Sequence, residues 1–240
     1  MTDRKHPWRP CPLGQHWVRE HPRTVPVSEE NPDGKTIVDG HCRNNPSRHE
    51  IFVAEEIHKI SAEHFKDIIN RPTPDDFGFP MGNAFDDFIA GWTQFWNEIF
   101  KPKEPLDPDL VKALIANESS FRTQIDTKSK DGTARGLIQL TERSRKILAN
   151  QKGELKDFLI TVPKDEIKDP NVNIFAGIRW LFHKKNLASH HLKREATWIE
   201  AIAEYKGIRT QLGKIEKAGR IMRDIDEKYR RLKGKEESKK

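Results

Sequence analysis

The stretch Asp107-Pro-Asp-Leu-Val-Lys-Ala-Leu-Ile-Ala-Asn-Glu-Ser-Ser-Phe121 carries the most structural information in this 240-residue chain. An acidic N-cap residue followed by proline at the first helical position is typical of a helix start. The apolar residues Leu110 to Ile115 recur at helical spacing, and the same face continues through Glu118 to Phe121. This pattern predicts a helix that turns one acid inward. Burial would raise the pKa of Glu118 and suit it to general acid catalysis, whereas the alternative is a salt-bridged glutamate at the rim.

Four segments follow one another in order along residues 107–207. They are Glu118-Ser-Ser-Phe121, Ala134-Arg-Gly-Leu-Ile-Gln-Leu140, Asn173-Ile-Phe-Ala-Gly-Ile-Arg-Trp-Leu181 and Ala203-Glu-Tyr-Lys-Gly207. They resemble the E-S-x-F, A-x-G-L-M-Q-L, N-I-x-x-G-x-x-Y-L and A-x-Y-N-x-G motifs of the soluble lytic transglycosylases. Ile138, Trp180 and Lys206 depart from the usual Met, Tyr and Asn. The interval from Glu118 to Gly136 is also longer than usual, and it holds a lysine-rich acidic loop over residues 126–132.

The resemblance implies a mainly α fold, with a lysozyme-like catalytic domain like that of goose-type lysozymes. It implies cleavage of the bond between N-acetylmuramic acid and N-acetylglucosamine in peptidoglycan. Glu118 would be the sole general acid and base, the product would be a 1,6-anhydro sugar, and no cofactor is expected. Asp126 and Asp131 are possible second acids for a hydrolytic, lysozyme-like alternative, since most glycosidases use two carboxylates. A non-catalytic protein that binds cell wall or nucleic acid on the same fold is the other alternative.

The matched segments also supply supporting residues. Gly136 permits close backbone approach beside the acid, and the Gln139 amide can orient a sugar substituent. By resemblance, Tyr205 would hydrogen-bond the catalytic carboxyl, and Ser120 and Asn173 would brace the site or the substrate. The complete set of expected substrate-binding or supporting residues is Ser119, Ser120, Gly136, Ile138, Gln139, Asn173 and Tyr205.

The chain is predicted to have three parts. Residues 1–48 repeat a hydrophobic-Val-x-x-His-x-Arg unit, once from Trp17 to Arg23 and again from Ile37 to Arg43. Asn31-Pro-Asp-Gly34 between the copies is a turn signal, so a small β-hairpin module is expected. Residues 49–104 are predicted to form a helical scaffold, with helices over residues 49–69 and from Asn83 to Phe100. The aromatic stripe of the second helix is expected to be core. The catalytic domain and a basic C-terminal helix would occupy residues 105–240.

The N-terminal part contains possible zinc ligands. Cys11, His16, His41 and Cys42 are the right residue types for a zinc site, although their spacing matches no standard finger. A disulfide between Cys11 and Cys42 is an equally open alternative, and it would form after export. The module is expected to bind the wall, to serve in delivery, or to cap the helices behind it.

Charge is distributed unevenly along the chain. Residues 1–48 carry a net charge of +2, residues 49–107 carry −7, and residues 108–240 carry +11. A basic C-terminal half suits an anionic partner, and peptidoglycan carboxylates fit the family resemblance. Nucleic acid is not the expected partner, because acids are interleaved with the basic residues 214–231. No apolar run approaches the roughly 18 residues of a membrane span, and no secretory signal is visible. Action at the cell wall or periplasm would therefore need another route of export, such as a secretion or phage apparatus.

Overall fold

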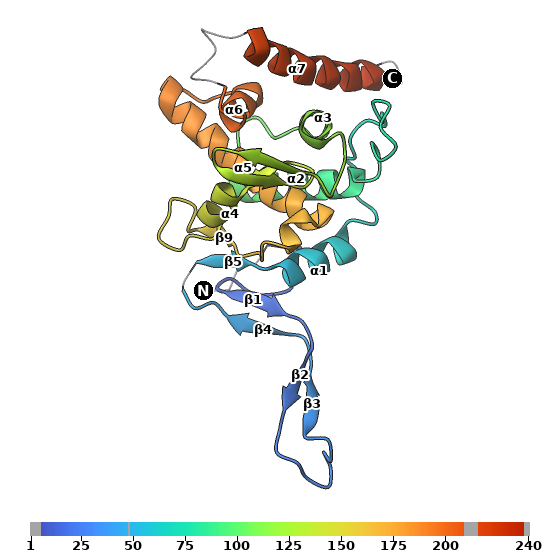
Figure 1. The fold of residues 1–240 in the computed structure, drawn as a ribbon, viewed down its shortest axis with the longest axis vertical. Coiled ribbons are helices and arrows are strands. Elements are labelled where there is room, and N and C mark those ends of the chain that lie inside the picture. Colours follow the sequence, from blue (N-terminus) through green and yellow to red (C-terminus); the bar gives the residue numbers. More distant parts are fainter. Residues whose placement is uncertain (1–5, 48, 209–215, 238–240) are drawn as a thin grey trace.

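The computed structural model describes residues 6–47, 49–208 and 216–237. Its helices are α1 (Ala54–His64), α2 (Asp86–Phe100), α3 (Pro108–Ser119), α4 (Glu142–Leu148), α5 (Pro170–Leu192), α6 (Trp198–Tyr205) and α7 (Glu216–Glu237), with a short 3-10 turn at Glu166–Lys168. The fold is mainly α, as predicted, and an extended β arm projects from one end of the helical body (Figure 1).

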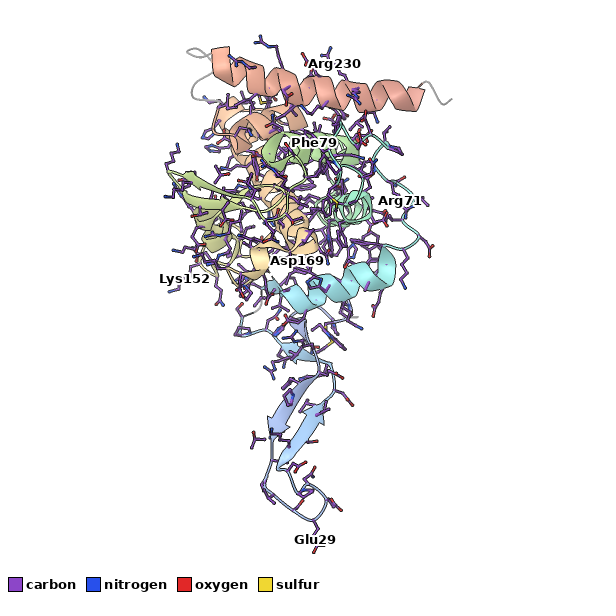
Figure 2. The ribbon with its side chains drawn as sticks, turned by 45° about the vertical axis from the view of Figure 1, so that its right-hand side comes forward. Glu29, Arg71, Phe79, Lys152, Asp169 and Arg230 are labelled. Atoms are coloured by element: carbon purple, nitrogen blue, oxygen red, sulfur yellow. A yellow bond between two sulfur atoms is a disulfide. The ribbon has the colours of Figure 1, made fainter. Side chains whose placement is uncertain are left out.

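The β arm is one long hairpin built from the sequence repeat. Strands β1 (Gln15–Val18) and β4 (His41–Asn44) pair at its base, and β2 (His21–Thr24) and β3 (Lys35–Val38) pair beyond them. Val18 lies opposite His41 and His21 lies opposite Val38, so the two copies are related by a local two-fold axis. Gly34 adopts the positive φ of 60° that the predicted turn requires. The arm carries Glu29 to the far end of the molecule (Figure 2).

A disulfide closes the base of the β arm by joining Cys11 to Cys42. It leaves neither thiol available to a metal, so the zinc alternative for Cys11, His16, His41 and Cys42 is corrected to a disulfide. The two histidines have other partners: His16 Nδ1 lies 2.7 Å from Asn45 Oδ1, and His41 Nδ1 lies 2.9 Å from the Asp39 carbonyl oxygen. The chemistry of the cysteines is thus used to anchor the arm.

The region 49–69 is not one helix, as its apolar spacing predicted. Strand β5 (Glu50–Phe52) comes first and pairs in parallel with β9 (Phe158–Ile160), and only then does α1 begin. Ile51 and Phe52 are buried in this pairing. The wrong prediction has a physical reason, because a three-residue apolar run has the same periodicity at the start of a helix and in a buried strand.

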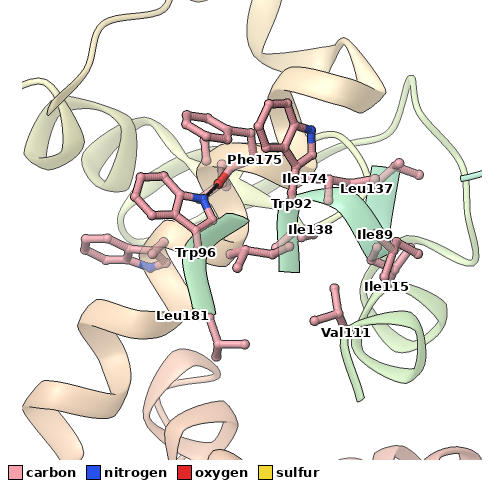
Figure 3. Packing of buried hydrophobic residues seen from close by; sticks show 14 of the residues in the cluster. Ile89, Trp92, Trp96, Val111, Ile115, Leu137, Ile138, Ile174, Phe175 and Leu181 are labelled. Atoms are coloured by element: carbon pink, nitrogen blue, oxygen red, sulfur yellow. Dashed lines mark hydrogen bonds between the residues drawn. The ribbon is translucent and has the colours of Figure 1, made fainter. Parts of the chain in front are cut away.

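The aromatic stripe of α2 is core, as predicted. Trp92, Phe95 and Trp96 are fully buried and meet Phe175 of α5. The indole nitrogen of Trp96 donates to the Phe175 carbonyl oxygen at 3.0 Å (Figure 3). The indole of Trp92 donates to Asn171 Oδ1 at 2.7 Å, so the tryptophans have polar partners inside the core.

Helix α2 begins at Asp86, and the predicted cap, Asn83, has a different role. Its side-chain oxygen accepts a hydrogen bond from Lys112 Nζ of α3 at 2.6 Å. Lys112 is completely buried, and it also pairs with Asp86 at 2.8 Å. Burial raises the pKa of Asp86 to about 6 despite that lysine. Asn83 is therefore needed to satisfy a buried ammonium, which outweighs its capping preference.

The proline-marked segment between α2 and α3 is held against the helices. Asn97 exchanges two hydrogen bonds with the backbone of Leu106, and Trp198 Nε1 donates to the Glu104 carbonyl oxygen at 2.9 Å. The buried apolar cluster also runs without interruption from Phe52 to Ile225. We propose that residues 49–104 and the catalytic region 105–208 form one folded unit, with the β arm as a separate appendage.

Helix α3 starts as its sequence predicted and is covered by α7 (Figure 1). The Asp107 side chain accepts from the Asp109 backbone N–H at 2.9 Å, and it also accepts from the Tyr229 hydroxyl of α7 at 2.8 Å. Ile225 and Leu232 of α7 are fully buried. The C-terminal helix is thus an amphipathic cover for the helix that carries Glu118.

We expect Asp107→Ala to lower the free energy of unfolding by about 1–2 kcal/mol, because it removes both the cap of α3 and a contact with α7. Urea unfolding would measure the loss. Asp226→Ala is the matched control, since Asp226 pairs only with Arg230 on the exposed side of α7, and about 0.5 kcal/mol or less is expected there. Equal losses in the two variants would contradict the capping role.

Candidate functional site

Glu118 lies in the last turn of α3, where the polypeptide is about to leave the helix. Its side chain is only 11% exposed, and burial raises the pKa of its carboxyl. The ammonium of Lys206, at the end of α6, opposes that rise, because its Nζ donates to Glu118 Oε1 at 3.0 Å. Both parts of the prediction are present in one residue: an inward-facing acid, and an ion pair that shields it.

Ser119 and Ser120 complete the helix end in different ways. Ser119 is 1% exposed, and its hydroxyl donates to the Ile115 carbonyl oxygen at 3.2 Å. It therefore supports the helix and faces no open space. Ser120 is the C-cap residue and adopts a left-handed conformation with φ 52°. Ser120 lines a separate hollow with Phe79, Phe121 and Asp126.

Tyr205 does not hydrogen-bond Glu118, in contrast to the contact implied by the family resemblance. Its hydroxyl donates to the Ile138 carbonyl oxygen instead. Burial raises the Tyr205 pKa well above its ordinary value, and the nearby Glu118 charge adds to the rise. Because the next residue, Lys206, already occupies the carboxyl, the tyrosine is directed to the backbone beneath the site.

Asn173 is a fully buried brace, as expected. Its Oδ1 accepts from the Ile138 N–H at 2.8 Å, and its Nδ2 donates to the carbonyl oxygens of Arg135 and Ile167 at 3.1 and 2.7 Å. Gly136 lies against this amide with φ 73°, where a Cβ atom would come within 2.5 Å of Asn173 Nδ2. The glycine and the asparagine are thus required together.

Ile138 stands where the family motif has methionine, and it is buried against α5. A Cβ atom on Gly177 would come within 2.6 Å of Ile138 Cδ1, so the glycine makes room for the branched side chain. The backbone of Ile138 connects Asn173 below to Tyr205 above. Ile138 is therefore a support for the site, and its side chain does not reach the surface.

A cleft of about 300 Å³ opens beside this framework, between α4, α5 and α6. Gln139, Asp131 and Tyr205, all expected site residues, line it. Gln139 adopts φ 55°, and its Nε2 donates to the Gly136 carbonyl oxygen at 2.8 Å. Its amide oxygen has no bond within the described residues, and so it is the part of the side chain suited to a ligand.

Several further residues of the cleft were missed from the sequence. Trp180, His183 and Lys184 of α5 line it, and Arg143 of α4 lies on its edge. Lys184 Nζ lies 4.8 Å from the centre of the Trp180 ring, and burial lowers the pKa of His183 to about 4. The signal was present, because residues 180 and 184 follow Asn173 at 7 and 11 positions and therefore share its helix face.

The two possible second acids are both held in ion pairs. Asp126 Oδ1 lies 2.9 Å from Lys168 Nζ, and it lines the hollow that contains Ser120. Asp131 Oδ1 lies 3.0 Å from Arg143 NH1, and it lines the same cleft as Gln139 and Tyr205. The structure brings Asp131, but not Asp126, to the cleft.

The comparison with protein families agrees with this geometry. The model of the transglycosylase SLT domain matches residues 97–225, which is more than half of the chain. The chain belongs to the SLT transglycosylase family. The match includes α3, the Gly136 and Gln139 turn, α5, α6 and the first part of α7. The family assignment made from the four motifs is therefore confirmed.

The SLT match leaves the β arm, α1 and most of α2 outside its range. The comparison with curated proteins finds no match. None of the described helices has the length and apolar character needed to cross a bilayer. The family indicates an enzyme of the lytic transglycosylase type that acts on the peptidoglycan of the cell wall.

Proposed function

We propose that this protein is a peptidoglycan lytic transglycosylase in which Glu118 is the only general acid and base. Glu118 would protonate the glycosidic oxygen between N-acetylmuramic acid and N-acetylglucosamine. It would then take the proton of the muramyl C6 hydroxyl as that oxygen attacks C1. The products would be a 1,6-anhydro-muramyl end and a new N-acetylglucosamine end, with no water consumed.

The observation that supports this proposal best is the environment of Glu118. The carboxyl is largely withdrawn from solvent at a helix end that the SLT match includes, and burial favours its protonated form. A protonated carboxylic acid is what the first step needs. The two cleft-lining acids near it carry cationic partners, Arg143 for Asp131 and His183 for Glu154, so both are suited to remain charged and not to donate a proton.

The cleft also suits an anionic glycan. Arg143 and Lys184 bring positive charge to its lining, and Trp180 brings an aromatic ring. A substrate with lactyl and peptide carboxylates would be attracted by such a lining. We propose that Gln139 directs its amide oxygen toward a sugar N–H or hydroxyl in this cleft.

The nucleic-acid alternative has less support. The basic residues of α7 have acidic partners within the protein: Lys228 with Asp224, Arg230 with Asp226, and Arg231 with Asp75. Lysines and arginines that are engaged in this way contribute little to phosphate binding. Lys214, at the start of the basic stretch, lies outside the described residues.

Product analysis tests the proposal. Purified sacculi are incubated with the protein, and the soluble muropeptides are weighed before and after reduction with borohydride. We expect muramyl ends that are lighter than reducing ends by one water and that borohydride leaves unchanged. Reducing ends would instead establish the hydrolytic alternative, with Asp131 as the first acid to examine. No release by the wild-type protein would contradict both enzymatic proposals and leave a wall-binding protein.

A further inference from the structure

Lys206 is the residue in which this site departs most from the pattern of its motif, where the family usually has asparagine. Its side chain is 15% exposed and lies between three helices. Besides Glu118, its Nζ donates to Asn117 Oδ1 at 2.9 Å. Asn117 in turn donates to Asp224 Oδ2 of α7 at 2.8 Å. The ammonium is thus held in place by contacts on both sides of the acid.

The surroundings of Glu118 contain few other charges. Tyr205, on α6, lies near enough to sense its charge, but the hydroxyl is neutral and faces Ile138. On α7, Asp224 lies beyond Asn117 and is paired with Lys228. Lys206 is the only cation that touches the Glu118 carboxyl among residues 6–47, 49–208 and 216–237.

We propose that Lys206 is a positioning residue that holds the Glu118 carboxylate in a fixed ion pair between turnovers and thereby restricts catalysis to lower pH. This proposal rests on the proposed role of Glu118 as the acid. A neutral asparagine at the same position could hold the carboxyl by a hydrogen bond without stabilising its charge. Lys206 does both, so the charged form of Glu118 is more favourable here than in a site with asparagine.

The sign of the pH effect follows from the charges. The first catalytic step requires protonated Glu118, so activity falls as pH rises through the pKa of that group. Burial raises this pKa, and Lys206 pulls it back down. Removal of the ammonium therefore moves the alkaline limit of activity to higher pH. An opposite charge in direct contact changes a carboxyl pKa by about 1–3 units, so an upward shift of about one unit or more is expected.

The experiment follows Glu118 directly. Protein labelled with ¹³C at glutamate is titrated by NMR, and the Glu118 carboxyl signal is identified by its loss in Glu118→Gln. We expect the midpoint to rise by about one unit or more in Lys206→Met and in Lys206→Asn, and to stay near the wild-type value in Lys206→Arg. The alkaline limb of kcat/KM on sacculi should shift by the same amount in each variant. Thermal unfolding checks that each variant folds.

Lys228→Met is the matched control, because Lys228 pairs with Asp224 in the same network without touching Glu118. It should leave the Glu118 midpoint unchanged. An unchanged midpoint in Lys206→Met, or an equal shift in Lys228→Met, would overturn the proposal. The titration needs no substrate. A shifted midpoint in a protein that releases nothing from sacculi would therefore contradict the proposed function while supporting the ion pair.

Discussion

Glu118→Gln is expected to reduce the release of muropeptides from sacculi by about 10³-fold or more, because the amide can neither give nor take the proton. Glutamine keeps the shape of the side chain, and its carbonyl oxygen can still accept from Lys206. The loss should therefore appear in kcat, while binding to sacculi stays close to that of the wild type. Initial rates of release and a pull-down with intact sacculi measure the two effects.

Glu63→Gln provides the control for this substitution. Glu63 lies on α1, where it forms an exposed ion pair with Lys59, and it has no contact with the cleft. We expect its activity to stay within about twofold of the wild type, since exposed ion pairs contribute little even to stability. A Glu118→Gln protein that keeps more than a tenth of wild-type activity would show that another group supplies the proton.

Gly136→Ala should be the most destabilising small substitution near the site. An added Cβ atom would lie 2.5 Å from Asn173 Nδ2 and 2.7 Å from Asn173 Cγ, and the φ of 73° strains any residue other than glycine. Relief of the clash requires Asn173 to give up hydrogen bonds to buried backbone groups. We expect a loss of about 3 kcal/mol or more in the free energy of unfolding, measured in urea.

Two comparisons separate the clash from the backbone strain. Gly78→Ala has a similar φ of 80° with no heavy atom within 4 Å, so only about 1–2 kcal/mol is expected there. In an Asn173→Ala background the obstacle is absent, and Gly136→Ala should then cost about as much as Gly78→Ala. If Gly136→Ala costs the same with and without Asn173, the proposed dependence of the glycine on the asparagine is wrong.

Local sequence signals predicted much of the fold. The Asp107-Pro108 start of α3, the aromatic face of α2 and the hairpin turn at Gly34 are each decided by residues a few positions apart. Strand β5 was mistaken for a helix because its identity depends on pairing with β9, more than a hundred residues later. Asn83 was misassigned because the buried Lys112 competes for its side chain.

The site was predictable to the same degree. Glu118 stood out because helical spacing and a motif coincide at one residue, and the buried bracing role of Asn173 followed from its motif. The ion pair with Lys206 joins residues 88 positions apart, and no local pattern encodes it. Lysine at that position was visible as a departure from the motif, but its partner became evident only once α6 was placed against α3. The same displacement explains why Tyr205 faces Ile138.

The parallel pairing of β5 with β9 sets an order on biosynthesis. Glu50 cannot find Phe158 until the ribosome has released more than a hundred further residues, and Trp92 and Trp96 must likewise wait for Phe175. Contacts so distant in sequence slow folding. The emerging N-terminal half therefore exposes an aromatic helix before its cover exists, and a chaperone that recognises such surfaces would have its longest opportunity to bind at that stage of translation.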